Sequence, residues 1–270
     1  MTMSFEAPPI VVSDERAGSL ARRMLGGSAA ASLYAYRDDE PLPFVAHGLA
    51  TDGSLVVAAT PERMLAAVAP GYAIDVRMDL VKQSPDPSVS LVAASLHLLG
   101  TLTWATASEV ADRLAGGGLP SLVAAMLDAP GTRLGFIDVE RALLHDLDGA
   151  TVIAHDEMYY APQVIEDEYA AFGALISHDQ AALKDLCWAV MVGAVPGQVV
   201  AKPPLPMMCP HTADMVLCVD VDTTGVTVML VGRSETLVVN ACFDAVARSQ
   251  GELEARVVKL MRDAAPALAG

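Results

Sequence analysis

The chain has 270 residues, of which 53% are hydrophobic and 19% charged, so it can bury the core of one large domain or of two small ones. Its formal net charge of −16, from 17 basic and 33 acidic residues, argues against binding nucleic acid through its phosphates or docking on anionic lipid. The acidity indicates either an ordinary acidic cytosolic surface or an acidic face for a basic protein partner.

The sequence also indicates a reduced, cytoplasmic protein. No apolar run approaches the ~18 residues that span a membrane, and residues 1–9 carry Glu6 and no basic residue, unlike a secretory signal. The four cysteines show no C-x-x-C spacing and are expected to be buried free thiols: Cys187, Cys209, Cys218 and Cys242.

The N-terminal half reads as many strands with short helices between them. After an extended arm over residues 1–13, helices are expected over Asp14–Leu25, Val110–Leu114 and Ser121–Leu127, and Thr60 is expected to cap another. The expected strands are Ala29–Tyr36, Pro43–Leu49, Ser54–Ala59, Tyr72–Lys82, Ser88–Leu98, Gly100–Ala107, Thr132–Leu147 and Thr151–Ala154. Because the elements do not alternate as regular βαβ units, a closed or partly closed barrel is favoured.

The C-terminal part is expected to begin after a junction near Ala161–Asp167. A helix is expected over Glu168–Val192, with a break at Ser177 as one option. Val195–Pro210 holds five prolines, which predict a long ordered loop and exclude a helix or a central strand. Three strands and a helix then follow: Val216–Val221, Val226–Val231, Thr236–Ala241 and Gln250–Met261. One face of this helix is apolar and consists of Leu253, Val257, Leu260 and Met261.

These C-terminal segments resemble one protein family. A buried strand, the turn Asp222–Gly225 with the pattern D-x-x-G, two further strands, Phe243 and a closing helix look like the C-terminal domain of haem-utilisation proteins. Ser177–Leu183 is similar to a family helix segment whose histidine falls at His178, with Ser177 standing where the family has aspartate.

The N-terminal half is similar to the same family, whose barrel is of the pyridoxamine-phosphate-oxidase type. Ala17–Leu25 looks like its first helix, and Asp86–Leu91 resembles the start of one of its strands. Glutamyl-tRNA-reductase-binding proteins and mycobacterial-type haem-binding proteins are relatives. The resemblance implies an α+β fold with an FMN-binding-type split β-barrel over residues 14–162, followed by a smaller α+β domain over residues 163–270. It also implies a homodimer and a haem or related tetrapyrrole ligand.

The stretch Met207–His211, with the sequence M-M-C-P-H, holds the first candidates for contact with haem. Thiolate and imidazole are both axial ligands of haem iron, so Cys209 or His211 is expected to bind the metal, with His211 preferred. Met208 is expected to pack against the porphyrin face. The alternative is a buried thiol beside a surface histidine.

Two further histidines complete the candidate site. His47 lies in an expected barrel strand, from which it could face a cofactor groove, and the alternative is a ring bonded to a backbone carbonyl. His178 is marked by the resemblance, and the alternative is a hydrogen bond where the helix breaks. His145 and His155 flank a turn and are expected at the surface.

No catalytic constellation stands out, which favours a binding protein over an enzyme. The chain lacks a zinc-ligand pattern, G-x-S-x-G and H-E-x-x-H. Flavin is the other ligand of such barrels, but residues 38–76 hold one basic residue, Arg63, followed by Arg77 and Lys82, a thin set for a phosphate. The first interpretation is a cytosolic haem-binding protein for haem handling or tetrapyrrole regulation. The alternatives are an FMN-dependent oxidoreductase, a haem-degrading enzyme and a non-catalytic regulator of another enzyme.

Overall fold

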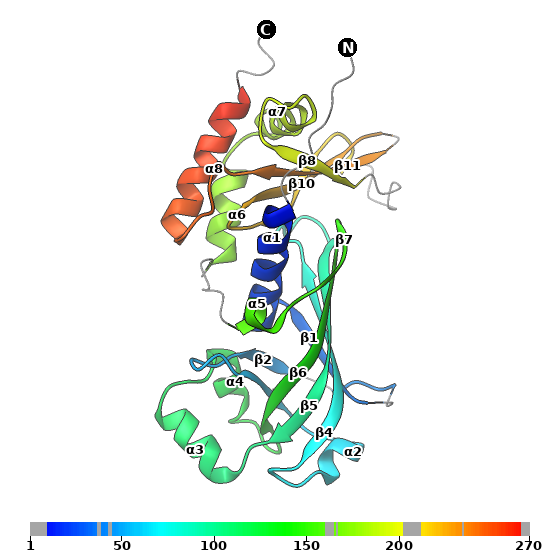
Figure 1. Ribbon diagram of the computed structural model, residues 1–270, viewed down its shortest axis with the longest axis vertical. Coiled ribbons are helices and arrows are strands. Elements are labelled where there is room, and N and C mark those ends of the chain that lie inside the picture. Colours follow the sequence, from blue (N-terminus) through cyan, green and yellow to red (C-terminus); the bar gives the residue numbers. More distant parts are fainter. Residues whose placement is uncertain are drawn as a thin grey trace.

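A computed structural model describes residues 10–36, 39–42, 45–159, 165, 167–201, 212–233 and 235–265. In this part the chain is a mixed α+β protein with a seven-stranded and a four-stranded sheet, so the expected fold class is confirmed. The two sheets lie one beyond the other along the long axis of the molecule (Figure 1). No helix in the described ranges is long and apolar enough to cross a membrane.

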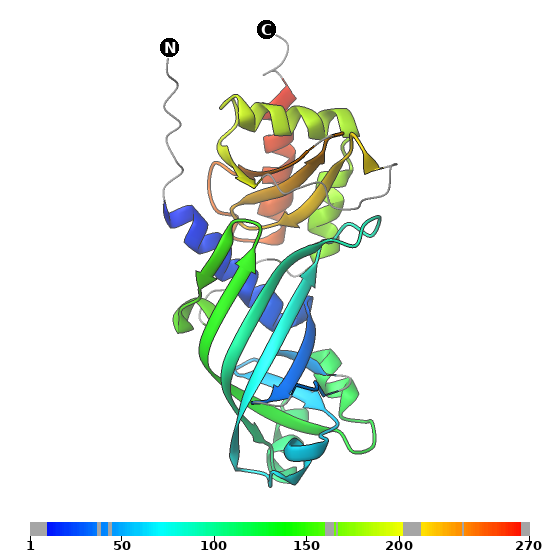
Figure 2. The ribbon, with the colours of Figure 1, turned by 90° about the vertical axis from the view of Figure 1, so that its right-hand side faces the viewer.

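The larger sheet is a curled antiparallel half-barrel. Its strand order is β1-β4-β5-β6-β3-β2, and β7 pairs with β6. The strands curl around helix α1, which lies on the concave side (Figures 1 and 2). The strands are β1 (Ala30–Ala35), β2 (Ala46–Leu49), β3 (Leu55–Ala59), β4 (Ala73–Gln83), β5 (Val92–Trp104), β6 (Arg133–Asp146) and β7 (Gly149–Val152).

Helix α1 (Ile10–Arg23) fills the hollow of the half-barrel and continues into the π-helical turn η1 (Met24–Ser28). It begins at Ile10, so the extended arm expected up to residue 13 is wrong for residues 10–13. The β-branched run at residues 10–12 has low helix propensity, which is why the sequence pattern favoured an extended chain. Ala17, Leu20, Ala21, Met24 and Leu25 are buried in the same apolar cluster as the inward-facing strand residues.

Strand β5 is one long strand, although two strands were expected. The pairing with β6 shifts between Leu99 and Gly100, so a β-bulge interrupts the alternation without ending the strand. A Cβ atom on Gly100 would lie 2.1 Å from the Asp138 carbonyl oxygen, which explains the need for glycine. A bulge breaks the two-residue alternation of buried and exposed side chains. The sequence pattern therefore predicted, wrongly, that one strand ends here and another begins.

Four short helices flank the half-barrel: α2 (Arg63–Ala67), α3 (Ala107–Ala115), α4 (Ser121–Met126) and α5 (His155–Tyr159). Helix α3 begins three residues before the expected Val110, because Thr106 and Glu109 form a reciprocal capping box. Thr60 does not cap α2, whose N-cap is Glu62.

The smaller sheet has the antiparallel order β8-β11-β10-β9 and packs against three helices. The elements are α6 (Glu168–Ile176), α7 (Gln180–Met191), β8 (Gly197–Ala201), β9 (Val216–Val221), β10 (Gly225–Val231), β11 (Thr236–Cys242) and α8 (Gln250–Ala264). The helix break near Ser177 is confirmed, and Asp179 caps α7. The apolar face expected on the last helix is buried, which confirms that prediction. Strand β8 was not expected; among the described residues it is an edge strand paired with β11.

Each sheet has its own hydrophobic core. One cluster is formed by residues between Ala17 and Met158, and another by residues between Ile165 and Ala264. This separation supports the proposal that residues 14–162 and 163–270 are two domains, a division that stays a prediction.

A buried ion cluster joins the two sheets. It consists of Arg23 at the end of α1, Lys82 on β4, Glu168 on α6, and Asp220 and Asp222 at the end of β9; we refer to these five residues as the Arg23 network. The guanidinium of Arg23 donates to both carboxylate oxygens of Asp220, at 2.9 and 2.6 Å. It also donates to Glu168 at 2.8 Å and to Asp222 at 3.1 Å, and the ammonium of Lys82 bonds the second oxygen of Glu168.

The basic side chains of this network are almost completely shielded from water. The side chains of Arg23 and Lys82 are only 4% and 1% exposed, so neither charge is solvated by bulk water. Burial alone would lower the pKa of Arg23, but the carboxylates of Asp220, Asp222 and Glu168 outweigh it and raise that pKa well above its ordinary value. Arg23 therefore stays charged, and its stability in the interior depends on these carboxylates.

An apolar cluster also joins the two sheets. Ala93 on β5 packs in one buried cluster with Leu217, Val219, Met229, Val231 and Val238 of the smaller sheet. The Ser84 hydroxyl donates to the Cys218 carbonyl at 2.6 Å, which ties the end of β4 to β9. Apolar burial supplies most of the free energy of such a contact, whereas the ion pairs fix its geometry.

Replacing Arg23 by methionine should destabilise the protein by about 3–5 kcal/mol, because the buried carboxylates of Asp220 and Asp222 would lose their cation and the partly exposed Glu168 would lose one of its two. The free energy of unfolding from urea titration measures the effect. Arg233→Met is the matched control: its ion pair with Asp214 is exposed, so little change is expected. Equal stability of the two variants would contradict the role of the network.

The network should also make stability depend on acidic pH. Burial would raise the pKa of Asp220, but Arg23 outweighs it and lowers that pKa below the ordinary value of 3.8. A depressed carboxyl pKa contributes stability above the unfolded value and loses it as pH falls through the folded value. Unfolding free energies measured between neutral pH and the acid range should therefore fall below about pH 4. Asp220→Asn should flatten this fall; an unchanged slope would contradict the account.

Candidate functional site

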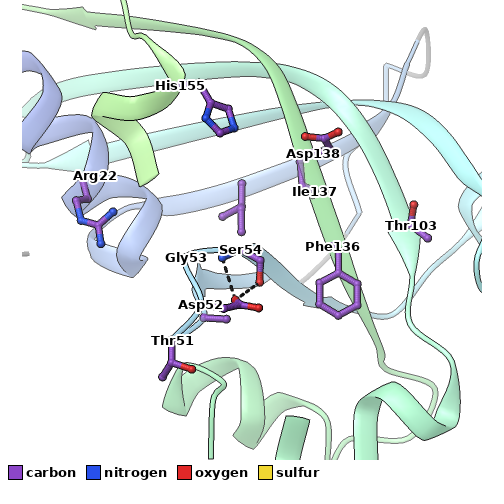
Figure 3. A pocket seen from close by; sticks show the side chains of 12 residues that line it. Arg22, Thr51, Asp52, Gly53, Ser54, Thr103, Phe136, Ile137, Asp138 and His155 are labelled. Carbon is purple, nitrogen blue, oxygen red and sulfur yellow. Dashed lines mark hydrogen bonds between the residues drawn. The ribbon is translucent and has the colours of Figure 1, made fainter. Parts of the chain in front are cut away.

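An open cleft of about 580 Å³ lies at the side of the half-barrel. The turn between β2 and β3 forms its floor, β5 and β6 form one wall, and the ends of α1 and α5 form the other (Figure 3). The residues that line it are Arg22, Ala50, Thr51, Asp52, Gly53, Ser54, Leu55, Thr103, Phe136, Ile137, Asp138 and His155.

The floor is a tight turn held by Asp52. Its carboxylate accepts hydrogen bonds from the Ser54 amide at 3.1 Å and hydroxyl at 2.6 Å, and Gly53 adopts a φ of 84°. Arg113 of α3 lies 2.8 Å from the same carboxylate. Hydrogen bonds from Arg113 and then from Ser54 hold the pKa of Asp52 well below its ordinary range. Asp52 is therefore a fixed anion and not a proton donor at neutral pH.

One wall of the cleft presents an aromatic ring. Phe136 is half-buried on β6, directly across from Thr103 on β5. The guanidinium of Arg113 lies 5.2 Å from the centre of the Phe136 ring, within cation–π range. Arg113 thus links the floor to the wall. Figure 3 shows the Phe136 ring at the side of the cleft.

The opposite side carries His155 and Arg22. His155 is the exposed first residue of α5, and Arg22 is the half-buried neighbour of Arg23 on α1. Arg22 donates to the Met158 carbonyl at 3.0 Å, which joins α1 to α5, and burial lowers its pKa. The cleft therefore combines an imidazole, a guanidinium and an aromatic ring, which suit a metal centre, a carboxylate and a flat ligand.

Sequence reasoning missed this combination. His155 was expected only as a surface residue, and Arg22 was not singled out. They are 133 positions apart and line the same cleft because α1 and α5 pack together. No local spacing in the sequence carries that information.

A second cavity, a groove of about 450 Å³, lies beside α7 and the smaller sheet. Its walls are mainly apolar and include Trp188, whose surface is 45% exposed, together with Met191, Leu230 and Leu237. Lys184 and Asp214 stand among the lining residues, and Asp214 follows His211 by three positions.

Three of the five candidate ligands from the sequence cannot be placed. Met208, Cys209 and His211 lie outside the described residues. Among the described residues, no group of three or more histidine, cysteine, aspartate or glutamate side chains forms a metal site.

The other two candidates lie apart from both cavities. His47 is 4% exposed on β2, and its Nε2–H donates to the Met24 carbonyl at 2.8 Å. Burial lowers the pKa of His47 despite this bond, so the ring is neutral and anchors the turn after α1. His178 lies between α6 and α7, and its Nε2 is buried without a hydrogen-bond partner among the described residues. Neither histidine lines the cleft or the groove.

The basic residues considered for a flavin phosphate are engaged elsewhere. Arg63 pairs with Glu40, and Lys82 belongs to the buried Arg23 network. Arg77 lies over the Tyr34 ring at 4.2 Å and pairs with Asp79. None of the three lines the cleft or the groove.

Comparison with known proteins supports the fold. A haem-binding protein from Mycobacterium smegmatis has a similar structure, with a TM-score of 0.50 and 15% sequence identity over 96% of this chain and 99% of that chain. A protein of unknown function from Agrobacterium tumefaciens matches 97% of this chain and 100% of its own with a TM-score of 0.37 and 15% identity. No family model matches the sequence, and no curated protein does. At 15% identity the likeness to the Mycobacterium smegmatis protein shows the fold alone, a curled half-barrel of the split-barrel type with accompanying helices.

The two buried thiols, those of Cys187 and Cys218, should be inert in the folded protein. Burial raises the pKa of Cys187 to about 12 and raises that of Cys218 still more clearly, so little reactive thiolate forms. Iodoacetamide at neutral pH should leave both unmodified, as measured by peptide mass spectrometry, whereas urea should expose them to alkylation. Rapid native labelling of Cys218 would contradict the packing of β9.

Proposed function

We propose that this protein binds haem or a related tetrapyrrole in the open cleft, as a binding protein without flavin. The observation that carries the proposal is the likeness of its fold, over 96% of the chain, to a haem-binding protein. A fold does not determine a ligand, so the proposal also requires a cavity with suitable chemistry.

The cleft offers groups that such a ligand needs. Its volume of about 580 Å³ lies in the range of about 300–1,000 Å³ for small-molecule sites. His155 supplies an imidazole, a common ligand of haem iron, and Phe136 supplies a flat apolar surface. Arg22 supplies a guanidinium that can pair with a propionate. In this proposal His155 is the axial ligand.

The charges around the cleft restrict the orientation of an anionic porphyrin. The charge of Asp52 is compensated by Arg113, whereas Asp138 is exposed on the wall formed by β6. The propionates are therefore expected to point towards Arg22 and away from Asp138, since like charges at short range are unfavourable.

The ligands suggested by the sequence define a second proposed location. Cys209 and His211 belong to the segment that leads to Asp214, and Asp214 lines the groove beside Trp188. An indole and the apolar side chains around it would cover a porphyrin face, and Lys184 could pair with a propionate. Variants at His155 and His211 separate the two locations.

Binding of FMN and of protein partners stays a prediction. An FMN-dependent oxidoreductase is less favoured, because Arg63, Arg77 and Lys82 are paired away from both cavities. The homodimer, the regulatory protein partner and the degradation of haem rest on the family resemblance alone.

Haemin added to the purified protein should give a saturable shift of the Soret absorbance, whereas FMN in a parallel titration should give no change. His155→Ala should weaken haemin binding at least tenfold, because the iron would lose its protein ligand. Arg22→Gln should weaken it less, through the loss of one charged pair.

The same titration separates the possible failures. No saturable shift with the unaltered protein would overturn haem binding itself. A normal response in His155→Ala, together with loss of binding in Cys209→Ala/His211→Ala, would keep haem binding but move it to the groove. Circular dichroism checks that each variant keeps its secondary structure.

A further inference from the structure

We propose that His97 and His145, on the outer face of the half-barrel, form a binding site for a transition-metal ion of the Zn²⁺, Cu²⁺ or Ni²⁺ class. The site is separate from the cleft and the groove and does not depend on the proposed haem function. Figure 2 shows β4, β5 and β6 in front of α1, with this outer face towards the viewer.

The strand register brings the two imidazoles together. His145 on β6 lies directly across from Ser95, and His97 follows two residues later on β5, so both side chains project from the same face. Their ring centres are 5.4 Å apart and the ring planes are inclined by 74°. Two imidazoles on one tetrahedral Zn²⁺, with Zn–N distances of about 2.0–2.1 Å, have ring centres roughly 5 Å apart. The observed spacing of 5.4 Å is therefore close to that of two imidazoles on one metal ion.

Asp79 prepares one of the two ligands. It lies across from His97 on β4, and its Oδ1 is 2.8 Å from His97 Nδ1. A carboxylate that accepts the Nδ1–H fixes the tautomer in which Nε2 has the free lone pair, as in carboxylate–histidine–metal arrangements. His97 Nε2 contacts the Ser95 hydroxyl at 3.4 Å, a weak contact that a metal ion can replace.

The scaffold and the surroundings suit an exposed two-ligand site. His97 has a side chain that is 46% exposed and His145 is exposed, so an ion can reach both rings from solvent. The strands beneath them are long and central in the sheet, which holds the ligands more rigidly than loops would. Two protein nitrogens leave the remaining coordination positions to water. Imidazole suits zinc, copper and nickel better than magnesium or calcium.

Isothermal titration with ZnCl₂, on protein without a histidine tag, tests the proposal. The unaltered chain should bind one ion, and His97→Ala and His145→Ala should each weaken binding at least tenfold. Asp79→Asn should weaken it by about 10–100-fold, the effect expected for the loss of a carboxylate partner. Thr101→Ala, on the same face of β5, is the control and should bind like the unaltered protein.

Copper gives a second, independent measurement. Cu²⁺ bound to the unaltered chain should show nitrogen splittings from two imidazoles in its electron paramagnetic resonance spectrum, and either histidine variant should lose them. The proposal is overturned if the unaltered chain binds no Zn²⁺, or if the His97→Ala/His145→Ala variant binds it equally well. These residues are at the surface, so the variants should fold, which circular dichroism verifies.

Discussion

The placement of one buried guanidinium, that of Arg23, governs how the rest of this structure fits together. Its side chain leaves the end of α1 and is surrounded by carboxylates from α6 and β9. A buried cation without partners would be costly, so folding of the half-barrel around α1 and docking of the smaller sheet depend on each other. Lys82 adds a second buried cation, which meets the same Glu168 from β4.

The same short segment prepares the cleft. Arg22, one residue before Arg23, turns towards α5 and the cleft, while Arg23 turns towards the smaller sheet. The turn that follows α1 is anchored by the bond from His47 to the Met24 carbonyl. The end of α1 that joins the two sheets through Arg23 therefore also carries Arg22, one of the candidate ligand groups. The exposed groups of the candidate site therefore depend on buried side chains that hydrogen-bond and form ion pairs beneath them.

Much of the fold could be predicted from local pattern. The alternation of buried and exposed residues gave most strands of the half-barrel, and the apolar face of the last helix is buried as expected. Errors occurred where one backbone detail breaks the period. The bulge at Gly100 divided one strand into two expected ones, and the β-branched start of α1 was read as extended chain.

The candidate site was harder to predict, because it is assembled from residues far apart in the sequence. Arg22 and His155 line one cleft through the packing of α1 on α5. The sequence around Asp220 and Asp222 did not indicate that both carboxylates pair with a distant arginine. The family resemblance pointed to a haem-type ligand but not to a cavity. The packing of α1 on α5, which no pattern of spacing encodes, decides where these ligand groups lie.

The most direct measurement is the location of iron in crystals of the protein grown with haemin, from the anomalous scattering of the metal. The account predicts one iron peak in the cleft, at coordination distance from the His155 imidazole. A peak in the groove beside Trp188, or no ordered iron in crystals that contain haemin, would contradict it.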